Sequence, residues 1–346
     1  MSGAAPKVTV AIPVFNRETY VGATIESVLS QSFTDFELLV VDDASSDGSC
    51  AVVESFDDPR IRLHRQPENL GVARVRNLCL ELARGEYLAF LDSDDLSHPG
   101  RLAAQVAFLD AHPDHAAVGA WSQWMDEAGR PLKRFKRKPL AAEDIAAQRL
   151  FRAGIENSTA MARTAVIRAY GHDDRYDIGE DYDLWARMAV DHKLANLPQV
   201  LVLRRTHEQA TTRLVADRKQ RQRQAIYAAQ LERLGVAFTE RDLERHFLLR
   251  RMNKLGFVPD RDYLDWGEAW LLKLQSANRS ARCYPEPAFS KVLGSFWLRV
   301  CWRASRGLGW HAWRRLAGSP LRRWAGVGLW QDLALSAPQP VARLMA

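Results

Sequence analysis

The chain has 346 residues, of which 47% are hydrophobic and 26% are charged, and this ordinary composition excludes a disordered or fibrous protein. The length accommodates one large α/β domain and a smaller appendage. The net charge of +6 favours anionic partners, such as phosphates, nucleic acid or an acidic membrane face, without selecting among them.

The first hundred residues alternate short apolar, β-rich runs with helical patterns. The apolar runs predict strands at residues 8–15, 36–41, 61–64 and 87–91. Two helices are indicated by apolar residues that share one helical face: Val21, Ile25, Val28 and Leu29 in the first, and Val72, Val75, Cys79 and Leu82 in the second. Alternating strands and helices predict a mostly parallel sheet covered by helices on both faces.

Acidic residues follow two of these strands directly. Asp42 and Asp43 come after a continuous apolar run that is typical of a strand buried on both faces. Asp92, Asp94 and Asp95 come after the strand that ends at residue 91. In open α/β sheets ligands bind beyond the carboxyl ends of the strands, so both acidic turns are candidates for a functional site.

Beyond residue 100 the pattern changes twice. Residues 121–139 predict a hairpin or a mobile loop before a helix near Ala142, and they carry a basic group: Lys133, Arg134, Lys136, Arg137 and Lys138. After His207 the alternation stops, and residues 213–274 have a helical pattern with charges spaced for solvated faces. We therefore expect an α/β domain over residues 1–212 and a mainly helical region over residues 213–346.

The acidic run Asp92-Ser93-Asp94-Asp95 is the strongest chemical signal. Three carboxylates in four residues repel one another. A hard divalent cation removes that repulsion, because Mg²⁺ and Mn²⁺ prefer oxygen ligands and bridge carboxylates to substrate phosphates. The alternative is a solvated acidic turn that caps the helix starting at Pro99.

Three further motifs have both a functional and a structural explanation. The carboxylate of Asp43 can accept the N3–H of a uracil ring, or it can cap the following helix. Arg74 and Arg76, about one turn into a helix, present fixed donors to phosphate or base oxygens, although arginines are also common on helix surfaces. Glu180 and Asp181 open another helix, where a partly desolvated carboxylate can act as a general base and any acid stabilises the helix end.

The order and approximate spacing of these motifs, with residues 8–17 (VTVAIPVFNR) and 27–33 (SVLSQSF), resemble the family-two glycosyltransferases of bacterial cell-surface polysaccharide type. The match spans roughly residues 8–207. It implies the Rossmann-like GT-A fold, with a nucleotide-binding half at about residues 1–98 and an acceptor half at about residues 99–212. It also implies an inverting enzyme that transfers a sugar from a nucleotide diphosphate sugar, with UDP-sugar favoured, to an acceptor hydroxyl.

The resemblance also assigns the site residues. Those that match nucleotide-binding positions are Pro13, Phe15, Asn16, Glu18, Asp43, Arg76, Asp92 and Ser93. Those that match positions around a Mn²⁺ or Mg²⁺ ion are Asp92, Asp94, Asp95 and His207. His207 lies in a segment similar to the closing element of the family, and the alternative for it is a surface histidine. Asp181 matches the catalytic base, and its neighbour Glu180 is the second candidate.

The implied reaction has two parts. The divalent cation bridges the diphosphate and stabilises the charge that develops on the leaving group. Asp181 removes the proton of the acceptor hydroxyl on the opposite face of the sugar, so that one displacement inverts the anomeric centre. The acceptor is a carbohydrate or a lipid-linked molecule, and we expect no nucleic-acid partner.

Other functions explain less of the sequence. A nucleotidyltransferase or a dinucleotide dehydrogenase would have a Gly-rich loop after the first strand, where this chain has Pro13-Val14-Phe15-Asn16. A glycoside hydrolase needs two carboxylates around the scissile bond but gives no reason for a nucleotide site. A non-catalytic sugar-nucleotide-binding protein remains an alternative, and the presence of Asp181 argues against it.

The C-terminal region from about residue 290 is rich in tryptophan and in basic residues. One acid, Asp332, accompanies the following bases: Lys291, Arg299, Arg303, Arg306, Arg314, Arg315, Arg322, Arg323 and Arg343. Aromatic and basic residues on short helices suit the surface of an anionic membrane. The alternative is a helical appendage that packs its Trp and Leu residues onto the catalytic domain.

The cysteines and the apolar runs indicate the cellular setting. The four cysteines have neither the close spacing of a zinc site nor the density of a disulfide scaffold: Cys50, Cys79, Cys283 and Cys301. The sequence shows no secretory leader pattern and no run of about 18 uninterrupted apolar residues. We expect reduced cysteines and a cytoplasmic protein, either free or peripheral on the inner face of the cell membrane.

Overall fold

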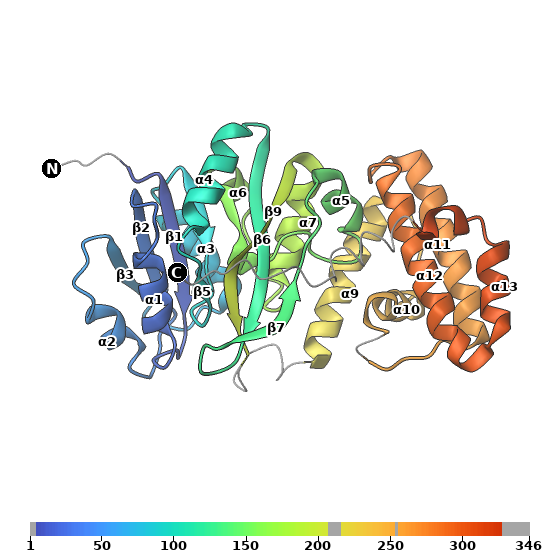
Figure 1. Cartoon of the computed structure of the whole chain (residues 1–346), viewed down its shortest axis with the longest axis horizontal. Helices are drawn as coiled ribbons and strands as arrows, with labels where there is room; N and C mark the ends of the chain where they lie inside the picture. The colour runs from blue at the N-terminus through green and yellow to red at the C-terminus, as the bar shows by residue number, and fades with distance from the viewer. Residues whose placement is uncertain (1–4, 207–215, 253–254, 327–346) are drawn as a thin grey trace. The chain divides into compact units, whose positions relative to one another are not determined.

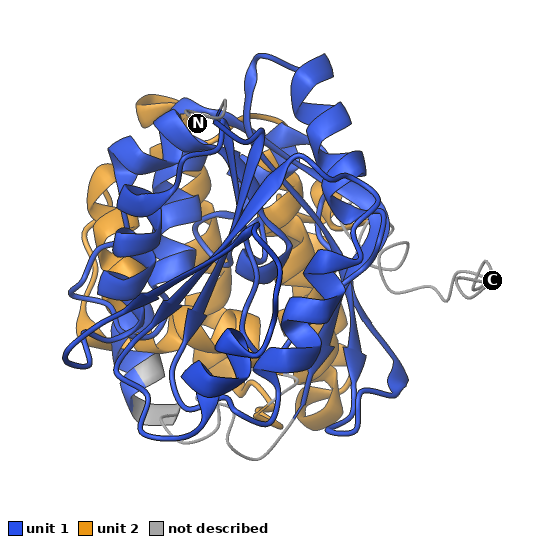
Figure 2. Cartoon of the chain, turned by 90° about the vertical axis from the view of Figure 1, so that its left-hand side faces the viewer, with its two compact units in different colours: residues 1–223 blue, residues 224–346 orange. Residues whose placement is uncertain are grey.

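A computed structural model describes residues 5–206, 216–252 and 255–326, and its helices and strands are shown in Figure 1. The chain divides into two compact units, residues 1–223 and 224–346, which are coloured separately in Figure 2. The division falls inside α9 (Ala216–Arg233). The boundary expected between residues 212 and 213 lies outside the described residues.

The first unit is built on one sheet, which has nine strands within the described residues. The strands are β1 (Val8–Val14), β2 (Phe36–Asp42), β3 (Ile61–Arg65), β4 (Tyr87–Phe90), β5 (Leu96–Ser97), β6 (His115–Met125), β7 (Pro131–Lys136), β8 (Met161–Arg163) and β9 (Lys193–Arg205). Their order is β3-β2-β1-β4-β8-β6-β9-β5, and β7 pairs with β6 at the side of this path.

Parallel pairing dominates the sheet. β1 is parallel to β2 and β4, β2 is parallel to β3, and β6 and β9 form a long parallel ladder. The antiparallel pairs, β4 with β8, β6 with β8, β6 with β7 and β5 with β9, are short. The prediction of a mostly parallel sheet is confirmed, and the four strands expected in the first hundred residues are each found to within one residue.

Helices cover the sheet on both sides (Figure 1). One core contains side chains of α1 (Val21–Leu29), α2 (Ser49–Glu54) and α4 (Arg101–Ala111), and the other contains those of α3 (Val72–Leu82), α5 (Ala142–Gln148), α6 (Thr164–Tyr170) and α7 (Glu180–Asp191). Leu38 and Val40 of β2 pack into the first core, whereas Leu39 and Val41 pack into the second. The apolar run of this strand is therefore continuous because both of its faces are covered.

The second unit is helical in its described residues. Its helices after α9 are α10 (Glu240–Arg251), α11 (Arg261–Ala281), α12 (Ala288–Leu308) and α13 (Trp310–Gly318). The side chain of Thr239 and that of Asp242 form a capping box at the start of α10. In the described part of the chain, no helix has both the length and the apolar character needed to cross a membrane.

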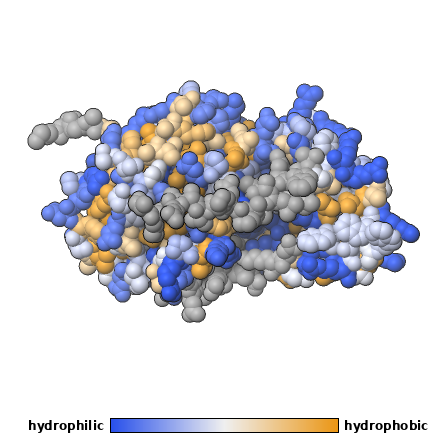
Figure 3. Space-filling view, in the orientation of Figure 1, coloured by the Kyte–Doolittle hydropathy of each residue, from blue (hydrophilic) through white to orange (hydrophobic). Residues whose placement is uncertain are grey.

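The aromatic residues of α12 and α13 divide between the interior and the surface. Phe296, Trp297 and Val300 are buried, and Trp297 and Val300 lie beside Gly267 of α11 within the second unit. Trp302 is 50% exposed and Trp310 is 73% exposed, so these two side chains are available for contact with a partner. On the face drawn in Figure 3, hydrophobic and hydrophilic residues are interspersed, as on most globular proteins.

Candidate active site

The loops after β1 and β2 are joined by hydrogen bonds between them. The N–H of Asn16 donates to Ser45 Oγ at 2.9 Å, and the N–H of Ser46 donates to Asn16 Oδ1 at 2.8 Å. The N–H of Gly48 donates to Glu18 Oε2 at 2.6 Å. Asn16 and Ala44 both have positive φ, 52° and 58°, a conformation that is rare for residues with a side chain. Such strain is held in place by the surrounding contacts and is common at functional sites.

Asp43 organises the start of α3. One of its carboxylate oxygens accepts the N–H of Leu70 at 2.7 Å and the other accepts the N–H of Gly71 at 3.0 Å. Phe15 is 45% exposed beside the Asn16 turn, at the end of the strand that contains Pro13. The sheet thus brings the nucleotide-binding candidates of the first two loops to one edge.

Arg76 joins two acidic motifs that are far apart in the sequence. From α3, its Nη2 donates to Asp92 Oδ1 at 2.9 Å and its Nη1 donates to Glu180. Burial of Arg76 disfavours its charged form, but the negative charges of Glu180 and Asp92 outweigh this effect and raise its pKa above the ordinary value. The acidic turn after β4 and the start of α7 are therefore held together by one guanidinium.

Glu180 and Asp181 have different surroundings at the start of α7. Glu180 is buried, accepts the N–H of Gly179 at 2.9 Å and contacts Arg76, and burial raises its pKa to about 7. Asp181 is half-buried and accepts the N–H of Tyr182 at 2.7 Å. Burial alone would raise the pKa of Asp181, but the charges of Arg76 and Arg223 lower it. Asp181 is therefore the ionised and more accessible carboxylate of the two.

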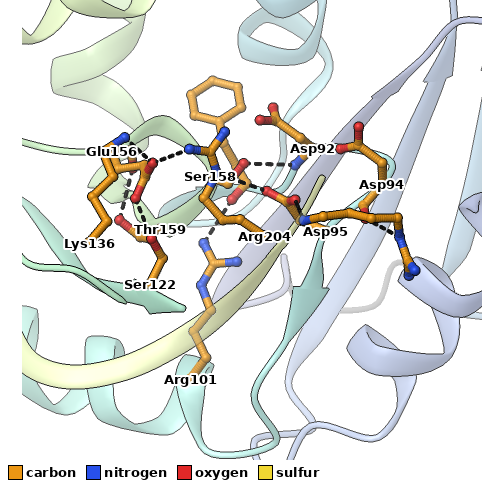
Figure 4. Close-up of polar contacts among 12 residues, drawn as sticks. Asp92, Asp94, Asp95, Arg101, Ser122, Lys136, Glu156, Ser158, Thr159 and Arg204 are labelled. Atoms are coloured by element: carbon orange, nitrogen blue, oxygen red, sulfur yellow. Dashed lines mark hydrogen bonds and ion pairs between the residues drawn. The ribbon is translucent and has the colours of Figure 1, made fainter. Parts of the chain in front are cut away.

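The turn after β4 separates its carboxylates. Figure 4 shows those of Asp92 and Asp94 on the same side of the turn, with that of Asp95 directed toward Arg204. Asp95 is buried, and its Oδ1 accepts the N–H of Arg205 at 3.0 Å. Burial raises the pKa of Asp95 well above its ordinary value, although Arg204 opposes this shift. Ser93 is also buried, and its carbonyl accepts the hydroxyl of Thr24 at 3.0 Å.

These positions bear on the expected metal ion. Within the residues that the structure describes, no three His, Cys, Asp or Glu side chains are grouped so that they could hold a metal ion. Asp92 and Asp94 offer hard oxygen donors, whereas Asp95 contacts Arg205 and Arg204. This donor set fits a Mg²⁺ or Mn²⁺ ion that completes its coordination with diphosphate oxygens. His207, the fourth expected ligand, lies outside the described residues.

Three residues that were not among the predicted site residues complete the site: Lys136, Glu156 and Arg204. Glu156, just before β8 in the chain, is buried and accepts the hydroxyl of Ser122 at 2.6 Å. Lys136 Nζ and Arg204 Nη1 both donate to Glu156 Oε1, the second at 2.5 Å (Figure 4). Burial alone would raise the pKa of Glu156, but the charges of Arg204 and Lys136 bring it far below its usual range.

The charged residues form a chain of alternating sign. On one side Arg204 lies between Asp95, with Nε 3.6 Å from Oδ2, and Glu156. Glu156 pairs with Lys136. Burial raises the pKa of Asp181, the charges of Arg76 and Arg223 lower it, and the charge of Lys136 lowers it further by a smaller amount. On the other side, Arg76 forms an ion pair with Asp92. Ion pairs therefore connect Asp95 to Lys136 through Arg204 and Glu156, and Asp92 to Glu180 through Arg76, while Lys136 and Arg76 act on Asp181 through their charges.

Arg101 supports the acidic turn from the interior. It is fully buried in α4, and its Nη2 donates to the carbonyls of Phe90 at 2.8 Å and Ala160 at 3.2 Å. Burial lowers the pKa of Arg101 to about 10, although the charges of Asp95 and Asp92 oppose that shift. Arg101 therefore anchors the end of β4 and places a positive charge behind the carboxylates.

Solved structures share the fold of this chain. The structure of residues 1–349 of TarS from S. aureus in complex with UDP-GlcNAc aligns with a TM-score of 0.55 and 20% sequence identity. The alignment covers 95% of this chain and 92% of the TarS chain. At this identity the likeness shows a shared fold, and it agrees with the expected GT-A architecture.

Sequence comparisons identify the family. The model of glycosyl transferase family 2 matches residues 9–171. The putative glycosyltransferase EpsE of Bacillus subtilis is 36% identical over 188 residues, 53% of this chain and 66% of EpsE. The succinoglycan biosynthesis protein ExoO of Rhizobium meliloti is 33% identical over 192 residues, 52% of this chain and 55% of ExoO. Residues 9–171 of the chain are therefore a domain of glycosyl transferase family 2.

Proposed function

We propose that this chain is an inverting glycosyltransferase that transfers a sugar from a UDP-sugar to an acceptor hydroxyl in the assembly of a bacterial surface polysaccharide. The observation that carries the proposal is the position of Asp181. It is a half-buried carboxylate whose pKa is lowered by Arg76, and Arg76 itself joins the neighbouring Glu180 to the acidic turn at Asp92. A sugar-nucleotide-binding protein without activity would have no need of such a carboxylate, and neither would a nucleotidyltransferase.

Asp181 is the proposed catalytic base. An ionised carboxylate can accept the acceptor's hydroxyl proton during attack, and a positioned base contributes roughly 10²–10⁴-fold to the rate. Glu180 is less suited to this role, because it is buried and its carboxylate already contacts Arg76 and the N–H of Gly179. The charge of Arg76 lowers the pKa of Asp181, and the bonds of Arg76 to Glu180 and Asp92 hold the start of α7 against the acidic turn.

Asp92 and Asp94 are the proposed ligands of a Mn²⁺ or Mg²⁺ ion. When bound, such an ion offsets the negative charge that develops on the departing diphosphate. Arg76 keeps Asp92 in place from α3, and the carbonyl of Asp94 accepts Arg205 Nε at 3.0 Å. We propose Asp95 as a supporting residue, since it is buried and receives the N–H of Arg205.

The loops after β1 and β2 are the proposed site for the uracil base. Each oxygen of Asp43 accepts one backbone N–H and keeps a second lone pair that can receive the N3–H of uracil. The exposed ring of Phe15 and the turn at Asn16 lie at the same edge of the sheet. Because TarS was solved with UDP-GlcNAc, this is the first donor to test.

Calorimetry tests the donor class and the ion together. UDP, GDP and dTDP are titrated with and without Mn²⁺ into the wild type, into Asp94→Ala, and into Asp57→Ala, a surface aspartate that serves as the control. We expect Mn²⁺-dependent binding of UDP that is lost in Asp94→Ala and retained in Asp57→Ala. Equal binding of UDP by all three proteins without Mn²⁺ would show that the acidic turn holds no ion.

We also propose that the second unit contacts an anionic membrane surface through Trp302 and Trp310. Both are exposed, and Arg306, whose guanidinium lies 5.8 Å from the Trp302 ring, is exposed beside them. Tryptophan favours the membrane interface and arginine favours anionic lipid. The test is sedimentation with vesicles of phosphatidylglycerol or phosphatidylcholine. The Trp302→Ala/Trp310→Ala variant should lose binding to the anionic vesicles, whereas Leu132→Ala, in the first unit, should keep it.

A further inference from the structure

One face of the strands β7, β6 and β9 carries several cations, one of which, Lys136, acts through its charge on the proposed base Asp181. Lys136 pairs with Ser122 across β7 and β6, and Trp124 pairs with Arg204 across β6 and β9. Directly paired residues share a face of the sheet, and Arg134 shares it with Lys136 because alternate residues of a strand point the same way. We call Arg134, Lys136 and Arg204 the cationic face.

Trp124 positions two of these cations. The guanidinium of Arg134 lies 4.4 Å from the centroid of the Trp124 ring, and that of Arg204 lies 4.9 Å from it. Cations over an indole ring are attracted by its negative faces, so the ring holds both side chains in place. The arginines are thus ordered before any ligand binds.

The positive charge of this face is only partly balanced. Lys136 and Arg204 share one carboxylate, Glu156, whose pKa is lowered by the charges of both and of Lys138 against the effect of burial. Burial lowers the pKa of Lys136, with a further contribution from Arg204, although Glu156 opposes the shift. Lys136 and Arg204 are thus balanced by Glu156 and, for Arg204, also by Asp95. Arg134 forms no ion pair with a carboxylate of the described residues, so it supplies the uncompensated positive charge of this face.

An edge strand often carries charged residues simply to prevent pairing with other chains. Lys133 and Arg134, both exposed, are sufficient for that purpose. Protection of an edge strand does not require Glu156 to be buried beneath Lys136, or Arg204 of β9 to lie over the Trp124 ring. The arrangement is therefore more than the protection of an edge.

We propose that the cationic face binds negatively charged groups of the acceptor, so that the substrate class is an anionic glycan with carboxylate or phosphodiester groups. This inference rests on the proposed function, since it places the anionic group near the hydroxyl that Asp181 deprotonates. Arginine provides a planar set of donors that matches both carboxylate and phosphate oxygens. Arg134, the exposed member of the face, makes the first contact with the glycan.

The strand itself provides a matched control. Arg134→Gln removes one cation from the face, whereas Lys133→Gln removes a cation from the neighbouring residue, which points to the other side of the strand. Both residues are exposed, so both variants should fold. The conservative variant Arg134→Lys retains the charge. Each protein is titrated with an oligogalacturonate, a glycerol phosphate oligomer and a neutral maltooligosaccharide of similar length, and separately with UDP and Mn²⁺.

We expect at least one anionic oligomer to bind more tightly than the neutral one. Arg134→Gln should weaken that binding by about fivefold. The affinity of Arg134→Lys should lie between those of the wild type and Arg134→Gln. Lys133→Gln should change the affinity by less than about twofold. The preferred oligomer identifies carboxylate or phosphodiester as the recognised group. Equal binding of neutral and anionic oligomers, no binding of either, or equal losses in Lys133→Gln and Arg134→Gln would overturn the proposal. If the wild type binds an anionic oligomer but does not bind UDP in the presence of Mn²⁺, the result would instead count against the proposed function.

Discussion

Arg76 Nη2 lies 2.9 Å from Asp92 Oδ1, so a helix near the start of the chain is bonded to the acidic turn that follows β4. The same guanidinium donates to Glu180 at the start of α7. Three motifs that are separate in the sequence thus become one charged cluster, in which the charge of Arg76 lowers the pKa of Asp181.

Replacement of Arg76 should destabilise the protein strongly. Arg76→Met leaves the buried Glu180 without its cation, and breaking a buried pair costs roughly 3–5 kcal/mol. Arg74→Met is the matched control, because Arg74 is 62% exposed and its partner Asp174 is also exposed. Surface changes of this kind alter stability by about 0.5 kcal/mol or less. Urea unfolding compares the two, and equal losses would contradict the role given to Arg76.

The pH dependence of stability should contain a contribution from Glu180. Its folded pKa is raised to about 7, so its contribution is fully present below its unfolded pKa of about 4.3 and is lost as pH rises through about 7. The wild type should therefore lose free energy of unfolding relative to Glu180→Gln between about pH 4 and pH 7, and the difference should level off above about pH 8. Parallel curves for the two proteins in urea unfolding would show that Glu180 does not titrate in this range.

Ala44 provides a test of the strained loop after β2. Its φ of 58° costs a residue with a Cβ roughly 1–2 kcal/mol, and glycine avoids this cost but loses more entropy on folding. Ala44→Gly should therefore be as stable as the wild type or slightly more stable, whereas Ala44→Val should be less stable by more than about 1 kcal/mol. Thermal unfolding measures both. A clear loss of stability in Ala44→Gly would mean that the loop does not hold this conformation.

Glu156 should be required for the stability of its cluster. Glu156→Gln keeps the size of the side chain but removes the negative charge shared by Lys136 and Arg204. We expect a loss of about 1–3 kcal/mol, since two partly buried cations lose their common partner. Glu143→Gln, in the first turn of α5, is the control. If denaturant unfolding finds the two variants equally stable, Glu156 is not the centre of this network.

Local patterns in the sequence were sufficient for the first half of the sheet. The apolar run before Asp42 is continuous because β2 is covered on both faces, and the acidic turns follow strands because parallel strands end at one edge. The acids of this edge and the start of α7 could therefore be found as motifs. What they contact could not, because the pairing of Arg76 with Glu180 depends on the packing of α3 and α7.

The other side of the site depends on pairing between distant strands. Glu156 has no local motif, and it becomes a site residue because β6, β7 and β9 bring Ser122, Lys136 and Arg204 to it. The basic group at residues 133–138 was visible in the sequence, and of the hairpin and the mobile loop that the pattern allowed, the structure has the hairpin. Its contact with the site depends on the register of that hairpin, which the sequence pattern does not determine.

The most direct test of the account measures UDP release from UDP-GlcNAc and other UDP-sugars with Mn²⁺, in the wild type and in Asp181→Asn. We expect the wild type to release UDP, and the first sugar product, observed by NMR before mutarotation, to have the inverted anomeric configuration. Asp181→Asn should be slower by roughly 10²–10⁴-fold with unchanged affinity for UDP. Turnover by Asp181→Asn at the wild-type rate, or a product with retained configuration, would contradict the assignment of Asp181 as the base of an inverting transferase.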